Sequence, residues 1–208
     1  MVGLKRIISV IGLILLISLS ACSSQSKYPT LHASLALDIP SYTTPEDQQL
    51  INTINSLKPG QRLILYVHSN GGGVIEGNKI ISAIDHTKGI VVADCHQWVA
   101  SMAAILILHC QEIKIADGTL VLYHAMRYEG PLGVEVVIHV PNLEIPQKAL
   151  EKDILTPKEM SIIYDKDGEV TLTANTLRDR LCSSSGRACP SELSLLKFYY
   201  TKIRSELL

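Results

Sequence analysis

The sequence predicts an α/β fold with a mostly parallel sheet, and two observations lead to that prediction. Short apolar runs typical of strands alternate with segments whose apolar residues recur at helical spacing. These strands are not separated by the short turns of hairpins, so the chain has room for crossover helices between them. The run at 63–67 is continuously apolar, which predicts a strand buried on both faces of the sheet.

The individual elements follow from local signals. Thr44 and Pro45 provide an N-cap and a first helical residue, and the apolar residues at 102–108 cover every side of a helix, which predicts a core helix. The expected strands are 35–39, 63–67, 90–93, 120–123 and 170–172. The expected helices are 44–58, 74–84, 102–108, 174–181 and 191–207. Prolines interrupt the segment 127–167, where we expect a hairpin near 133–140 and then one or two helices.

Composition excludes several classes of function. Nineteen Lys and Arg residues stand against twenty Asp and Glu residues, for a net charge of −1, so no clustered basic face for nucleic acid is expected. A single Trp and a single Phe disfavour a base-stacking platform. The five cysteines show no C-x-x-C spacing, which argues against a zinc ribbon or finger.

The N-terminus has the pattern of an export signal. Lys5 and Arg6 precede an apolar run at 7–19 that is too short to span a bilayer comfortably. The block Leu-Ser-Ala-Cys at 19–22 resembles the bacterial lipobox, which implies acylation of Cys22 and a lipid anchor. The alternatives are an ordinary cleaved signal and an uncleaved anchor. We therefore expect a signal peptide at 1–21, an anchor and tether at 22–33, and one domain at 34–208.

An exported chain resides in an oxidising compartment, where its cysteines can form disulfides. Cys182 and Cys189 flank a turn-rich loop and are expected to form a disulfide, with two free thiols as the alternative. A bond between Cys95 and Cys110 has weaker support. Ser23 after Cys22, in place of Asp, resembles lipoproteins of the outer membrane, so we expect the domain to face the periplasm from that membrane of a bacterial cell envelope.

The candidate catalytic residues lie where the predicted parallel strands end. Three loops are expected at that edge: 69–73, 96–101 and the turn that begins at His124. These loops contain three kinds of group: free backbone N–H groups beside a helix start, the Ser101 hydroxyl and the His124 imidazole. Together they could provide the oxyanion donors, the nucleophile and the base of a serine hydrolase. Each also has a structural explanation, namely a tight turn, a helix N-cap and a hydrogen-bonded strand-end histidine.

Three motifs in order carry a family resemblance. They are Tyr-Val-His-Ser-Asn-Gly-Gly at 66–72, Val-Ala-Ser-Met-Ala-Ala at 99–104 and Leu-Tyr-His at 122–124. Together they resemble the Clp-type serine peptidases of the ClpP/crotonase superfamily. The resemblance implies a spiral of ββα units with a mostly parallel sheet, Ser101 as nucleophile and His124 as general base. It further implies that the N–H groups of Gly72 and Met102 form the oxyanion hole, that the substrate is a peptide or protein, and that the chain is a homo-oligomer.

The third catalytic residue is less well defined. The resemblance places an acid before the block Leu-Thr-Ala at 172–174, at the offset that Glu169 occupies, with Asp167 as the competitor. A solvated turn at 166–169 is the structural alternative. Asn70 stands where the family has Pro, and Gln97, Trp98 and Val99 add bulk before the nucleophile. Export also separates the chain from ATP, so no ATPase partner is expected.

The sequence therefore predicts a membrane-anchored serine hydrolase, most simply a peptidase, with no cofactor. The alternative is a non-catalytic envelope scaffold or binding lipoprotein of the same fold, in which Ser101 and His124 are structural. A metal site is disfavoured, because neither Asp94-Cys95-His96 nor His109-Cys110 has the ligand spacing of a structural zinc site.

Overall fold

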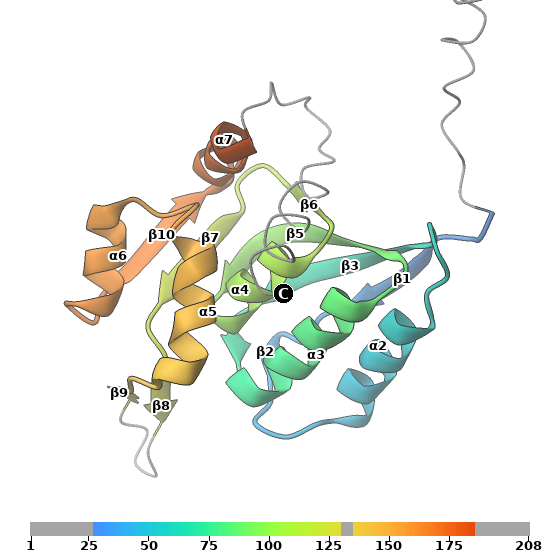
Figure 1. The fold of residues 1–208 in the computed structure, drawn as a ribbon, viewed down its shortest axis with the longest axis horizontal. Coiled ribbons are helices and arrows are strands. Elements are labelled where there is room, and N and C mark those ends of the chain that lie inside the picture. The colour runs from blue at the N-terminus through green and yellow to red at the C-terminus, as the bar shows by residue number, and fades with distance from the viewer. Residues whose placement is uncertain (1–26, 130–134, 186–208) are drawn as a thin grey trace, which may run out of the picture.

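The computed structural model describes residues 27–129 and 135–185 as a mixed α/β fold (Figure 1). Its strands are β1 (Leu31–Ser34), β2 (Asp38–Ile39), β3 (Arg62–Ser69), β4 (Gly71–Gly72), β5 (Ile90–Ala100), β6 (Glu112–Ile115), β7 (Leu120–His124), β8 (Arg127–Glu129), β9 (Glu135–Val137) and β10 (Glu169–Thr173). Its helices are α2 (Pro45–Ser56), α3 (Val74–His86), α4 (Met102–His109), α5 (Pro141–Glu151), α6 (Pro157–Tyr164) and α7 (Ala174–Ser185).

A single mostly parallel sheet organises these elements, which confirms the predicted fold class. The strand order is β1-β3-β5-β7-β10, and β6 also pairs with β5. Every pair in this sheet is parallel except β7 with β10. In Figure 1 the sheet runs from β10 on the left to β1 on the right, with α2 and α3 packed side by side over its right-hand part. Two small sheets, β2 with β4 and β8 with β9, complete the described part of the chain.

Strand β5 is longer than the sequence indicated, and it changes neighbours along its length. Its first part, up to Cys95, pairs with β6, whereas its last part, from Trp98 to Ala100, pairs with β7. Between the two parts Gln97 has a φ of 57°, and the register with β3 shifts there. The expected loop at 96–101 is therefore mostly strand, because a single irregularity lets the chain continue in the sheet.

Helix α2 begins as predicted. The Thr44 hydroxyl accepts a hydrogen bond from the Asp47 N–H (3.1 Å), and the Asp47 carboxylate accepts one from the Thr44 N–H (3.2 Å), which is a capping box. Pro45 occupies the first turn, where its missing N–H costs no hydrogen bond. Helix α4 also agrees with its prediction, since every residue from Met102 to Leu108 is buried.

One prediction about β3 is wrong. Leu63, Leu65 and Val67 are buried, but Tyr66, on the opposite face of the strand, is 41% exposed. The strand is therefore fully covered on one face only. On the other face the Tyr66 ring stacks against His32 of β1, with 5.8 Å between the ring centroids, and this contact replaces a covering helix at that position.

Several boundaries also differ from the expected ones. The sheet begins at Leu31, inside the segment expected to be a tether, and the expected strand at 35–39 is replaced by β1 and β2. Strand β6 was not expected, because its Glu-Ile-Lys-Ile sequence has only two apolar residues. The hairpin of the proline-rich segment is formed by β8 and β9, so it begins earlier than 133.

Some expectations concern residues outside the described ranges. These are the export signal with Cys22, the helix at 191–207 and Cys189. Within 27–129 and 135–185, none of the helices has the length and apolar character needed to cross a bilayer.

A buried polar cluster lies where α5 and α6 meet β7. The Glu151 side chain is completely buried and accepts hydrogen bonds from the Tyr164 hydroxyl (2.5 Å) and the Gln147 amide (3.1 Å). Burial raises the pKa of Glu151 above its ordinary value of 4.5, and these two hydrogen bonds offset only part of that effect. The neighbouring Tyr123 hydroxyl is buried without a hydrogen-bond partner in the structure.

This cluster predicts a pH-dependent free energy of unfolding. Because the folded-state pKa of Glu151 is raised, the unfolded chain ionises first, and stability falls as the pH rises from about 4.5 through the folded-state value. We expect Glu151→Gln to remove this contribution, so that the variant loses less stability than the wild type between about pH 5 and about pH 8. Denaturant titrations at both pH values measure the difference.

Glu46→Gln, at an exposed position of α2, is the matched control and should leave the pH dependence unchanged. The comparison uses differences between variants because Glu76, Glu144 and Glu159 have lowered pKa values and act in the opposite direction. Identical pH profiles for Glu151→Gln and wild type would show that folding does not raise the pKa of Glu151.

Candidate active site

Ser101 occupies a sharp turn between β5 and α4. Its φ of 55° and ψ of −128° are unusual for a residue with a side chain and cost free energy. Its N–H donates to the Leu122 carbonyl of β7 (2.9 Å), and its carbonyl accepts from the Ala104 N–H (2.9 Å). The Ser101 hydroxyl makes no capping hydrogen bond to α4, so the helix N-cap explanation of this serine does not hold.

His124 ends β7 at the same edge of the sheet. Because Ala100 is in register with Leu122 and the strands are parallel, Ser101 lies beside Tyr123, one residue from His124. The His124 Nδ1 atom is 2.6 Å from the Ala125 carbonyl oxygen. A carbonyl only accepts, so this contact places the proton on Nδ1 and leaves Nε2 with the lone pair that a general base needs.

The two side chains are not hydrogen-bonded to each other in the described structure. The backbones of Ser101 and His124 lie close together, and a hydrogen bond between the hydroxyl and the imidazole depends on the side-chain rotamers. Catalytic hydrogen bonds commonly tighten only when substrate binds, so this arrangement is compatible with a nucleophile and its base.

Gly71 brings the glycine-rich segment against the nucleophile. A Cβ atom at this position would lie 2.5 Å from the Ala100 carbonyl oxygen, 2.7 Å from the Met102 nitrogen and 2.7 Å from the Ser101 Cβ. The φ of Gly71 is +87°, a value that other residues seldom adopt. Glycine is therefore required here for both conformation and space. The sequence showed three adjacent glycines but not which of them touches the serine.

Backbone donors gather at this junction. Met102 is the first residue of α4, so its N–H has no partner within the helix. Strand β4 pairs with β2, where the Gly73 N–H donates to the Ile39 carbonyl (2.7 Å). The predicted oxyanion-hole residues, Gly72 and Met102, therefore flank Gly71 at one site.

The expected acids lie close by but have other partners. Glu169 is directly opposite His124 in the antiparallel pairing of β10 with β7, yet its carboxylate forms an ion pair with Arg127 (2.8 Å). Asp167 lies 3.7 Å from Nε2 of His139. Neither carboxylate is hydrogen-bonded to the described His124 ring. No local sequence pattern pointed to Arg127 or to the Ala125 carbonyl, because both contacts depend on how the chain turns after β7.

The residues expected to add bulk before the nucleophile lie on β5. Trp98 is half-buried and in register with Leu120, and Gln97 is exposed at the irregularity of the strand. Their bulk therefore belongs to the strand that leads into Ser101.

The cysteines divide into two groups. Cys95 and Cys110 are free thiols, fully buried, and burial raises the pKa of both, so neither is an activated nucleophile. Cys182 is disulfide-bonded, whereas its expected partner Cys189 lies outside the described residues.

The candidate metal ligands have other contacts. His96 pairs with Asp94 (3.1 Å) while Cys95 is buried on the other face of β5, and His109 pairs with Asp85 (2.9 Å). In the described ranges no three His, Cys, Asp or Glu side chains gather as a ligand set.

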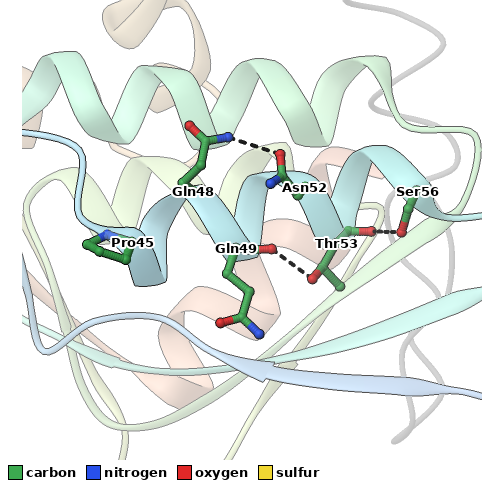
Figure 2. Close-up of a pocket in the computed structure, with 6 residues that line it drawn as sticks. All are labelled: Pro45, Gln48, Gln49, Asn52, Thr53 and Ser56. Atoms are coloured by element: carbon green, nitrogen blue, oxygen red, sulfur yellow. Dashed lines mark hydrogen bonds between the residues drawn. The ribbon is translucent and has the colours of Figure 1, made fainter.

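A surface depression on helix α2 offers no catalytic groups (Figure 2). It is lined by Pro45, Gln48, Gln49, Asn52, Thr53 and Ser56. Polar side chains here bond within the helix, for example the Gln48 amide to Asn52 (3.0 Å), and none of the six is ionisable. The depression is formed by one helix, separate from the strands that hold Ser101 and His124.

Comparison with known families adds one finding. The model of the Clp protease family matches residues 40–151, which is more than half of the chain. The match includes Gly72, Ser101, Met102 and His124, whereas Glu169 lies beyond its end.

The contact of Gly71 with Ser101 predicts an unusually damaging substitution. Gly71→Ala adds steric overlap with the β5–α4 turn to the cost of a positive φ, so we expect a loss of about 2–5 kcal/mol in the free energy of unfolding. Chemical denaturation measures this loss.

Gly118→Ala is the matched control, because Gly118 has a φ of +81° and nothing lies within 4 Å of the position that its Cβ would occupy. It should cost only about 1–2 kcal/mol. Equal losses in the two variants would show that the β5–α4 turn does not press on Gly71.

Proposed function

The chain belongs to the Clp protease family, and from this premise we propose that it is a serine peptidase in which Ser101 is the nucleophile and His124 the general base. The observation that carries the proposal is the turn at Ser101, where an unusual backbone conformation holds a serine that does not cap its helix. Strain of this kind is retained where the surrounding structure enforces it, and it is typical of functional sites.

The proposed reaction uses Ser101, His124 and the backbone N–H groups of Gly72 and Met102. Nε2 of His124 takes the proton of the Ser101 hydroxyl as its oxygen attacks a peptide carbonyl. The N–H groups of Gly72 and Met102 donate hydrogen bonds to the oxyanion, and the N-terminal end of α4 favours its negative charge. The tetrahedral intermediate collapses as His124 returns the proton to the leaving amine. Water, activated by the same imidazole, then releases the acyl group from Ser101.

A non-catalytic scaffold of the same fold is the second candidate, and specific observations favour it. The Ser101 hydroxyl and the His124 ring are not hydrogen-bonded to each other in the described structure, and the Glu169 carboxylate is bound to Arg127. In such a scaffold Ser101 and His124 would have no role in turnover.

Members of this family typically form oligomers and act on peptides. We propose the same for this chain, with a peptide or protein substrate and a homo-oligomeric assembly. Exposed apolar side chains on the β8–β9 hairpin support a contact with another chain, because Tyr128 is 58% and Val136 53% exposed and the two are in register.

We propose further that the chain is exported and anchored by lipid at Cys22 to the outer membrane, facing the periplasm. The basic residues, apolar run and Cys22 in that order support this proposal, although they lie outside the described residues. Cys182 gives independent support, because a disulfide is typical of an exported domain.

The catalytic proposal predicts labelling by a fluorophosphonate, which reacts with activated serines. Full-length protein in detergent should be labelled, and Ser101→Ala should abolish both labelling and peptide hydrolysis, a loss on the order of a million-fold in turnover. Ser82→Ala, at an exposed position on α3, is the control and should retain both. Labelling that persists in folded Ser101→Ala would show that Ser101 is not the nucleophile, and absence of labelling from folded wild type would favour the scaffold.

The lipid anchor predicts incorporation of radioactive palmitate into the growing bacterium's copy of the protein. Cys22→Ala should remove the label and block processing by the lipoprotein signal peptidase, because no thioether can form without the thiol. Ser23→Ala keeps the thiol and should be labelled normally. Unchanged processing of Cys22→Ala would mean that an ordinary signal is cleaved instead.

A further inference from the structure

Glu169 is placed where it can reach the catalytic histidine. It is the direct partner of His124 in the antiparallel pairing of β7 and β10, so both side chains project from the same face of the sheet. The Cβ atoms of such partners are about 5 Å apart, a separation that a glutamate spans easily. Its register thus fits the orienting acid of a Ser-His-acid triad.

The carboxylate is nevertheless occupied by another group. Oε1 of Glu169 lies 2.8 Å from a guanidinium nitrogen of Arg127, the first residue of β8 and only three residues beyond His124. Both side chains are partly exposed, at 24% for Arg127 and 45% for Glu169, and water weakens such a pair enough for it to exchange partners.

The imidazole meanwhile has a neutral acceptor. Nδ1 of His124 donates to the Ala125 carbonyl (2.6 Å), which fixes the ring and its tautomer. A carbonyl stabilises the imidazolium that forms during catalysis less than a carboxylate does, because charge-assisted hydrogen bonds are the stronger ones. The competing acid is also engaged, since Asp167 lies beside His139.

We propose that the ion pair with Arg127 keeps the Glu169 carboxylate from forming a hydrogen bond with His124. In this state the His124 ring of the Ser-His pair is oriented by a backbone carbonyl and not by an acid. This inference rests on the proposed peptidase function. Arg127 is a positioning residue that lowers activity, and exchange of Glu169 from Arg127 to Nδ1 of His124 completes the triad.

The test combines kinetics of four full-length variants on one chromogenic peptide. Arg127→Gln frees the carboxylate and should raise kcat roughly tenfold with KM nearly unchanged, because the acid acts on the transition state. Glu169→Gln alone should change kcat by less than about threefold, since the carboxylate is not on the histidine. The double variant should return to the wild-type rate. The control is Arg178→Gln on α7, which breaks the ion pair of Arg178 with Asp117 (2.6 Å) and should leave kcat and KM unchanged.

A second readout does not depend on turnover. In a Ser101→Ala background, the NMR signal of the His124 Nδ1–H should move downfield when Arg127→Gln is added, as the acceptor changes from carbonyl to carboxylate. Addition of Glu169→Gln should reverse that movement. Arg178→Gln should leave the signal in place.

Two results would overturn the inference. A loss of about a hundredfold or more in kcat for Glu169→Gln alone would show that Glu169 already orients His124. An unmoved Nδ1–H signal in folded Arg127→Gln would show that the ion pair with Arg127 does not keep Glu169 from His124. If the wild type instead proves no more active than Ser101→Ala, the peptidase proposal fails, and the NMR comparison still decides which group His124 contacts.

Discussion

The change of partners along β5 determines where chemistry can occur in this fold. Up to Cys95 the strand lies between β3 and β6, and from Trp98 it lies between β3 and β7. The turn that joins β6 to β7 is fixed at this point, because the Cys95 carbonyl accepts hydrogen bonds from the Ala116 N–H (2.9 Å) and the Thr119 hydroxyl (3.2 Å). Only after the change does β7, which ends in His124, lie next to the chain that leads into Ser101.

The site combines an apolar helix with unusual backbone. Helix α4 has no acidic residue in its first turn, so no side chain competes there for the partial positive charge of its N-terminus. Its first residue, Met102, packs its side chain against Gly77 of α3, where a Cβ would lie 2.3 Å from the Met102 Cγ. Gly71 of β4 and Gly77 of α3 therefore allow the start of α4 to pack closely against both elements. A close fit of this kind gives backbone donors a fixed direction, which stabilisation of an oxyanion requires.

The sequence revealed most of what is local and less of what depends on tertiary packing. Capping at Thr44, the apolar helix α4 and the strand end at His124 are each encoded by a few adjacent residues, and the structure has them as expected. The continuation of β5 through Gln97 was not predictable, because polar residues interrupt the apolar pattern at a bulge. The half-exposed Tyr66 was also missed, since an apolar run does not say which face a helix will cover. The partner of Glu169 depends on the turn after β7, on which the local pattern gives no information.

A crystal structure of the covalent adduct with a fluorophosphonate would show whether Ser101 is the nucleophile and which groups surround it. We expect a bond from phosphorus to the Ser101 oxygen, with the phosphonyl oxygen in hydrogen-bonding range of both the Gly72 and Met102 N–H groups and Nε2 of His124 facing the adduct. An adduct on another side chain, or a phosphonyl oxygen directed away from these two N–H groups, would contradict it.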